Sequence, residues 1–217
     1  MIAVRWKPVA NHFQIENLGG YYEVRLVSQD GTNRLTRACV LALTHAVLEL
    51  GREPKPLILT GNARFFSAGA DLSEIQALSA SSALEFATMG QTLMSTIECF
   101  PTPVYAAMHG YCMGGGLDLA LACHGRIASP HAVIGHRGAA LGLVTGWGGT
   151  QRLPRIVGQA RALGMFVAAE KLLAKDALGI GLVDAVAEDP VAEAVRRIRI
   201  TEKSFPGFAP AHSAGIP

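Results

Sequence analysis

A run of three glycines, Gly114 to Gly116, constrains this chain more than any other feature. It follows an apolar segment, 104–108, that is predicted as a short buried strand, and it precedes a helical pattern at 117–123. Because glycine has no Cβ, backbone or ligand atoms can approach such a helix start closely. The first N–H groups of the helix lack intrahelical partners and lie at the positive end of its dipole. This arrangement suits an anion or a developing oxyanion.

The glycines extend beyond this triplet, and 11 of the chain's 24 lie between Gly110 and Gly149. A lone triplet would favour tight helix packing alone. Here two further motifs accompany it, RFFSAGADL at 64–72 and LGLVTGWGGTQRLPRIVG at 141–158. In this order the three stretches resemble the enoyl-CoA hydratase/isomerase (crotonase) superfamily. The resemblance covers about residues 22–195.

The resemblance implies an α/β fold, a crotonase-type core of repeated ββα units wrapped by helices. We expect one such domain over 1–203 and a Pro/Gly/Ala-rich flexible tail over 204–217. Family members typically continue with a further helical segment that packs against neighbouring subunits, and we expect this chain to lack most of it. The family assembles as a trimer or a pair of trimers, so a homotrimer or hexamer is expected.

The sequence pattern alone also indicates an α/β core, because short strands alternate with helices. Residues 1–20 show no regular pattern, and 61–70 is predicted as a loop. Strands are predicted over 22–28, 56–60, 104–108, 125–129, 132–135 and 182–186. Helices are predicted over 36–50, 71–78, 82–98, 117–123, 150–157, 161–170, 176–178 and 191–200, the first capped by Thr36 and stopped by Gly51.

Composition narrows the choice of partners and compartment. The formal net charge is +2, and Lys and Arg form no block, which argues against a nucleic-acid surface. No apolar run reaches the roughly 18 residues of a membrane span, and no secretory signal is expected at the start. Four cysteines lack CxxC spacing and are predicted to be buried thiols, so we expect no metal site and a cytoplasmic protein.

The resemblance assigns backbone roles around the first two motifs. The N–H groups of Ala70 and Gly115 would together form an oxyanion hole for a thioester carbonyl. The stretch around Ala68 and Ala70 would face the adenine of coenzyme A, which is part of the substrate, and no separate cofactor is implied. Asp71 is expected mainly to cap the following helix. Leu72 and Gly114 are expected to lie against the same substrate.

Hydratases of this family use two carboxylates, and only the first position is filled here. Asp118 occupies it, one methylene shorter than the usual Glu, at a helix start whose dipole is expected to keep it ionised. The second position falls on Gly138, which cannot transfer a proton. His136 and Arg137 adjoin it: His136 could act as acid or base, and Arg137 could hold a carboxylate or phosphate. Both could equally be structural.

The third motif opens a helix beside the acyl pocket in the family, and Trp147 there could line the pocket or fill the core.

The sequence leaves three candidate functions open. The first is hydration or isomerisation of an enoyl-CoA, with Asp118 as the main acid/base. The second is a family hydrolase or decarboxylase that uses His136 or Arg137 with the same oxyanion hole. The third is an acyl-CoA-binding protein without chemistry, as the empty position at Gly138 would allow.

Overall fold

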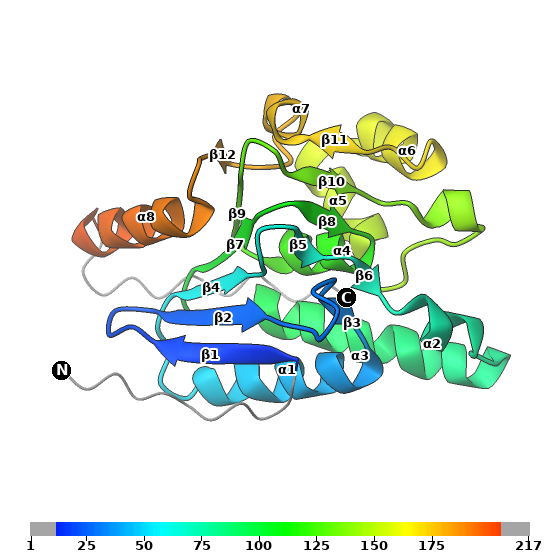
Figure 1. The fold of residues 1–217 in the computed structure, drawn as a ribbon, viewed down its shortest axis with the longest axis horizontal. Helices are drawn as coiled ribbons and strands as arrows, with labels where there is room; N and C mark the ends of the chain where they lie inside the picture. Colours follow the sequence, from blue (N-terminus) through cyan, green and yellow to red (C-terminus); the bar gives the residue numbers. More distant parts are fainter. Residues whose placement is uncertain (1–11, 205–217) are drawn as a thin grey trace.

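The computed structural model describes residues 12–204, with side chains to residue 200, and within them two parallel-rich sheets lie among eight helices (Figure 1). The larger sheet has the strand order β1-β2-β4-β7-β9-β12. Only its β1–β2 pair is antiparallel. Its strands are β1 (Phe13–Asn17), β2 (Tyr22–Leu26), β4 (Leu57–Thr60), β7 (Val104–Met108), β9 (Gly125–Ala128) and β12 (Ala185–Val186).

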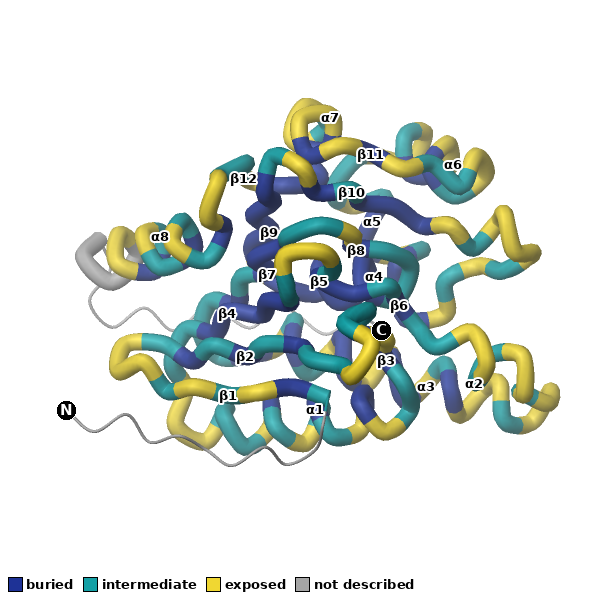
Figure 2. Tube along the Cα trace, in the orientation of Figure 1, coloured by how far each residue is buried: buried dark blue, intermediate teal, exposed yellow. Residues whose placement is uncertain are grey.

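Strands β4 and β9 form the buried centre of this sheet together with β7, because each is covered on both faces (Figure 2). Such strands are continuous apolar runs rather than alternating ones. On one face Ile58, Ala107 and Ile127 pack against the last helix, α8 (Pro190–Ser204). The opposite face joins the main core with α1 (Arg37–Leu50) and α3 (Ala80–Glu98).

A second sheet and a two-stranded ladder contain strands of the first two motifs. The second sheet has the order β11-β10-β8-β5, and the ladder pairs β3 with β6. These strands are β3 (Arg34–Leu35), β5 (Phe65–Ser67), β6 (Gly69–Ala70), β8 (Tyr111–Met113), β10 (Val133–Gly135) and β11 (Leu172–Leu173). The remaining helices are α2 (Leu72–Gln76), α4 (Gly115–Ala122), α5 (Gly149–Val157), α6 (Gln159–Val167) and α7 (Ala174–Gly179), with a 3-10 turn η1 (Gly138–Leu141).

Most predicted helices and strands are confirmed, and the main differences are strands that the sequence pattern did not predict. Residues 13–17 form β1 where no pattern was predicted, and the predicted loop 61–70 contains β5 and β6. Strands β5 and β6 have only three and two residues, too few to show a period. The helix of the glycine triplet begins at Gly115, two residues before its apolar pattern starts. The prediction of a flexible tail at 204–217 lies outside the described residues, except that Ser204 ends α8.

Two further expectations concern cysteines and membranes. Cys39, Cys112 and Cys123 are buried as predicted, whereas Cys99 is exposed where α3 ends, so the prediction was wrong for that thiol. Within residues 12–204 no helix combines the length and the apolar character needed to cross a lipid bilayer.

Helix α1 offers a matched test of this packing. Leu43 is fully buried in the main core, and Leu41, two residues earlier, is 54% exposed. We expect Leu43→Ala to lower the free energy of unfolding by about 2–5 kcal/mol, because it removes buried atoms and leaves a cavity. Leu41→Ala should change it by less than about 0.5 kcal/mol. Urea unfolding followed by circular dichroism measures both, and equal effects would contradict the assigned faces.

Candidate active site

The three motifs meet around a cavity of about 930 Å³ with mostly apolar walls. Ten of the eleven residues proposed from the sequence to act on or bind a substrate line it: Ala68, Ala70, Leu72, Gly114, Gly115, Asp118, His136, Arg137, Gly138 and Trp147. Asp71 is the exception. Its carboxylate accepts hydrogen bonds from the N–H groups of Ser73 and Glu74 at the start of α2, so its capping role is confirmed.

Strand β6 and the start of α4 touch without side chains between them. An ideal Cβ on Gly69 would lie 2.6 Å from the Met113 carbonyl oxygen and 3.1 Å from the Gly115 nitrogen. A Cβ on Gly115 would lie 3.1 Å from the Ala70 nitrogen. Gly114 precedes the helix with φ +50, and Gly115 is its first residue. Ala70 and Gly115 are therefore neighbours, and both residues line the cavity.

Ser67 and Asn33 hold this strand in place, and the sequence analysis identified neither. The Ser67 hydroxyl donates to the Asn33 carbonyl at 2.7 Å and accepts from the Gly69 N–H at 3.1 Å. Asn33 is buried with φ +52 and donates from Nδ2 to the Phe65 carbonyl at 2.9 Å. Asparagine tolerates this left-handed backbone better than most residues. These bonds fix the strand that carries Ala70.

Asp118 lies in the first turn of α4 and is 1% exposed. Its Oδ2 accepts a hydrogen bond from the Thr145 hydroxyl, while its Oδ1 lies 3.3 Å from His136 Nε2. Gly149 leaves room for this pair, since a Cβ there would lie 2.1 Å from Oδ1 and 3.0 Å from Nε2. Residues 118, 136 and 145 come from three separate segments, which explains why spacing in the sequence did not indicate their contact.

Burial shifts both members of the pair toward their neutral forms. Desolvation raises the pKa of Asp118 from 3.8 to about 7, against the opposing effects of the Thr145 hydroxyl, Arg152 and the Gly149 N–H. Desolvation lowers the pKa of His136 from 6.5 to about 4. The expectation that the helix dipole keeps Asp118 ionised was wrong, because burial outweighs it. Near neutral pH the site thus combines a neutral imidazole with a carboxyl group that can gain or lose a proton.

Gly138 occupies the position of the second family carboxylate, and its surroundings leave no space for a side chain. It begins the 3-10 turn, and its carbonyl accepts from the Leu143 N–H at 2.9 Å. A Cβ on Gly138 would lie 2.6 Å from the Leu143 carbonyl oxygen. A glutamate at 138 would therefore require the backbone of this turn to move. His136 is the nearby group that faces the cavity, with its ring 5.2 Å from that of Phe166.

Trp147 both lines the cavity and fills the core. It is 3% exposed, donates from Nε1 to the Phe86 carbonyl at 3.1 Å, and stacks on the Phe86 ring at 5.3 Å. Gly90 on α3 accommodates it, because a Cβ there would lie 2.1 Å from the Trp147 ring. Arg152 donates to the Trp147 carbonyl and pairs with Glu98 at 2.5 Å, which fixes the loop before α5.

The cavity rim carries two cations, Arg137 and Lys171, which are exposed and have no ion-pair partner among residues 12–200.

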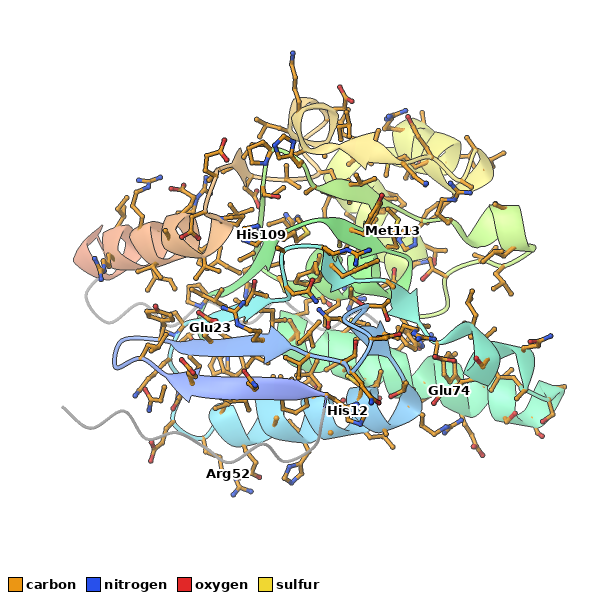
Figure 3. The ribbon with its side chains drawn as sticks, viewed as in Figure 1. His12, Glu23, Arg52, Glu74, His109 and Met113 are labelled. Atoms are coloured by element: carbon orange, nitrogen blue, oxygen red, sulfur yellow. The ribbon has the colours of Figure 1, made fainter. Side chains whose placement is uncertain are left out.

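Met113 and His109, both labelled in Figure 3, differ in their relation to the cavity. Met113 at the end of β8 belongs to its lining, whereas His109, directly after β7, does not. Across the described part of the chain no three His, Cys, Asp or Glu side chains are grouped as metal ligands.

Comparison with known proteins agrees with this geometry. The family model described as "Enoyl-CoA hydratase/isomerase" matches residues 18–205. The chain belongs to the enoyl-CoA hydratase/isomerase family. A probable enoyl-CoA hydratase of Bacillus subtilis (strain 168) is 42% identical over 163 residues, 75% of this chain. The chain spans only 63% of the length of that relative.

Solved structures confirm the predicted α/β crotonase fold. A structure of DspI from Pseudomonas aeruginosa has a TM-score of 0.87 at 31% identity, covering 94% of this chain and 85% of that one. The enoyl-CoA hydratase of Bacillus anthracis has a TM-score of 0.81 at 32% identity, covering 89% and 76%.

The opposite pKa shifts predict opposite effects of pH on stability. Asp118 binds its proton more tightly when folded, so its contribution to stability is present at low pH and is lost as pH rises toward about 7. His136 binds its proton less tightly when folded, so its contribution is lost as pH falls from 6.5 toward about 4.

Relative to the unmodified chain, we expect Asp118→Asn to become less stable as pH falls from 7 toward about 4, and His136→Gln to become more stable. Each slope is at most about 1.4 kcal/mol per pH unit, the value for one proton. Urea unfolding at several pH values measures them. Slopes of the same sign in both variants would refute the assigned directions.

Proposed function

We propose that this chain is an acyl-CoA thioester enzyme that hydrates or isomerises an enoyl chain. One observation carries the proposal: Asp118 Oδ1 and His136 Nε2 lie 3.3 Å apart in residues that line one cavity together with Ala70 and Gly115. A proton-transfer pair and two neighbouring backbone donors are what the chemistry of a thioester enolate requires. The family and the name of the Bacillus subtilis relative support the same reaction class.

The oxyanion hole is assigned to the Ala70 and Gly115 N–H groups. In this proposal the thioester carbonyl oxygen accepts both hydrogen bonds, and negative charge gathers on it as the enolate forms. Donors fixed in backbone need not reorganise during the step, and removal of one such donor typically costs about 3 kcal/mol of transition-state stabilisation. Ser67 and Asn33 contribute indirectly, because they hold the strand of Ala70.

In hydration, the carboxylate of Asp118 takes a proton from a water molecule whose oxygen adds to C3 of the 2-enoyl group. The electron pair of the C2–C3 double bond moves toward the thioester carbonyl and forms the enolate. The proton that Asp118 took is then delivered to C2, which gives the 3-hydroxyacyl thioester and restores both the thioester carbonyl and the Asp118 carboxylate. His136 is neutral at this pH, so it orients the water or relays the proton without adding a charge.

In isomerisation, Asp118 alone is sufficient. It takes a proton from C2 of a 3-enoyl thioester, the same oxyanion hole holds the dienolate, and the proton returns at C4. One carboxylate that can gain and lose a proton near neutral pH fits this sequence of steps. The geometry favours neither reaction over the other, since both use the same atoms.

The substrate is assigned to the cavity by its chemistry. Leu72 and Trp147 belong to the largely apolar lining, which suits an acyl chain. Ala68 and Gly114 lie with the oxyanion donors, where the pantetheine and adenine would pass. The exposed cation Arg137 would meet a phosphate or carboxylate at the rim. Assembly as a homotrimer or hexamer and a cytoplasmic location remain parts of this proposal.

Two alternatives keep the same cavity. A hydrolase or decarboxylase of this family would use His136 or Arg137 in place of a second carboxylate, as the lack of space at Gly138 suggests. An acyl-CoA-binding protein without chemistry would keep the backbone donors only. The buried contact of Asp118 with His136 favours an enzyme, because burying two titratable groups costs stability that a binding role would not require.

Asp118→Asn tests the main proposal. Asparagine keeps the shape but cannot accept a proton, so kcat for crotonyl-CoA hydration should fall by about 10² to 10⁴. Asp176→Asn is the matched control, because Asp176 is also a first-turn aspartate, on α7, and does not line the cavity. Loss of enoyl absorbance measures turnover. Unchanged kcat in Asp118→Asn would exclude Asp118 as the acid/base.

Coenzyme A binding measured on the same samples separates the alternatives. Turnover that Asp118→Asn abolishes supports a hydratase. Tight binding without crotonyl-CoA turnover would point to 3-enoyl, malonyl-type or cyclic acyl thioesters, and so to the isomerase or to the family hydrolases and decarboxylases. Absence of both binding and turnover would contradict an acyl-CoA role for this chain.

The raised pKa of Asp118 gives the expected pH dependence. The ionised carboxylate is the base, so kcat/KM should rise as pH increases through about 7 and then level off. His136 stays neutral down to about pH 4, so its protonation should add no second limb above pH 5. Stopped-flow or steady-state rates between pH 5 and 9 measure the profile. A rate that falls across this range would contradict Asp118 as base.

A further inference from the structure

The two oxygens of the Asp118 carboxylate have different surroundings. Oδ2 accepts the hydrogen bond of the Thr145 hydroxyl. Oδ1 and the facing His136 Nε2, 3.3 Å away, are both buried and make no hydrogen bond of normal geometry among the described residues, although the Gly149 N–H lies near the carboxylate and lowers its pKa. A buried carboxylate oxygen without a partner is costly, so this asymmetry needs an explanation. Asp118 and His136 both line the cavity, in which a water molecule or substrate would bind.

We propose that Thr145 is a positioning residue for the reaction: its hydroxyl engages Oδ2 of Asp118, and this leaves Oδ1 as the oxygen that exchanges protons with substrate or water. The inference rests on the proposed function, because it assigns the role of one residue within that chemistry. Thr145 was not among the residues that the sequence analysis identified.

The loop that carries Thr145 is anchored on both sides. Gly142 (φ +69) and Gly148 (φ +98) turn the chain at its ends, in the left-handed region that glycine allows. Gln91 of α3 donates to the Gly146 carbonyl at 2.8 Å. Trp147, next along the loop, is held in the core by Phe86. Threonine is β-branched and stiff at χ1, so a fixed backbone also fixes the hydroxyl.

The same hydrogen bond affects when Asp118 ionises. Donation to the carboxylate favours the ionised form and opposes the effect of burial on the pKa. The other titratable or charged groups around Asp118 are His136 after β10, Arg152 of α5 with its partner Glu98 of α3, and Cys112 of β8. A substitution at 145 leaves these groups unchanged, so a change in the pKa of Asp118 in such a variant measures the effect of the Thr145 hydroxyl.

Thr145→Val is the test, since it keeps the shape and removes only the donor. A hydrogen bond to a charged group contributes about 1.5–3 kcal/mol, so kcat at pH 7 should fall about 10- to 100-fold with KM nearly unchanged. The midpoint of the pH–rate profile should move from about 7 to about 8 or higher, and much of the rate should return at high pH. Thr145→Ser retains the hydroxyl and should restore both kcat and the midpoint.

Thr44→Val is the matched control, because Thr44 also donates a hydrogen bond, to the Val40 carbonyl in α1, far from the cavity residues. It should leave kcat and the midpoint as they are. Wild-type kcat and midpoint in Thr145→Val would overturn the inference. So would a loss of rate in Thr145→Val that Thr145→Ser shares and that leaves the midpoint near 7, since that pattern indicates shape rather than the hydroxyl.

A measurement without turnover separates this inference from the proposed function. The Asp118 carboxyl can be titrated by 13C NMR in the free protein, with Asp118→Asn used to assign its signal. We expect a higher midpoint in Thr145→Val than in the unmodified chain or Thr145→Ser. An unchanged midpoint overturns the role of Thr145, whatever the activity. A shifted midpoint in a chain whose Asp118→Asn variant remains fully active overturns both the proposed function and the catalytic part of the inference.

Discussion

The close approach of bare backbone from β6 to the start of α4 is the constraint on which the site depends. Gly69 and Gly115 allow it, since a Cβ on either would meet backbone of the other segment. Gly116 continues the contact, because a Cβ there would lie 2.8 Å from the Ser67 Cβ. Glycine loses more conformational entropy on folding than other residues, so this concentration of glycine lowers the stability of the fold. The same glycines allow the backbone of β6 to approach the start of α4. Ala70 and Gly115, 45 residues apart in sequence, thus lie together in the lining of one cavity.

The second determinant is the burial of a carboxyl group with an imidazole. Water would normally stabilise the charges of both, and its exclusion shifts each toward neutrality. The two shifts affect stability in opposite directions with pH, so the pair can be buried without making the fold strongly sensitive to acid. A glutamate at position 138 would place a third titratable side chain on a turn that has no space for its Cβ. The absence of that carboxylate is therefore consistent with the local packing and with the chemistry of the pair.

Much of this arrangement was predictable from the sequence. Helix α1 begins after Thr36 and ends before Gly51 as expected, because capping and stop signals are local. Ala70 and Gly115, which the family resemblance pairs, lie close together in the cavity lining, and Asp118 lies in the first turn of its helix as expected. The short strands β5, β6 and β8 were not found, since two or three residues show no period. The contact of Asp118 with His136 and Thr145 was also missed, because it joins three segments through tertiary packing alone. The ionisation of Asp118 was misjudged for the same reason, since burial is a property of the fold.

The position of Trp147 has an optical consequence. Its indole ring is shielded from solvent, stacked on Phe86, and forms part of the cavity wall. The chain has one other tryptophan, Trp6, which lies outside the described residues. A chain with Trp6 replaced by phenylalanine would therefore emit from a single indole placed beside the bound acyl group. Its fluorescence would report occupancy of the cavity directly, without a label and for substrates that absorb too weakly for a direct assay.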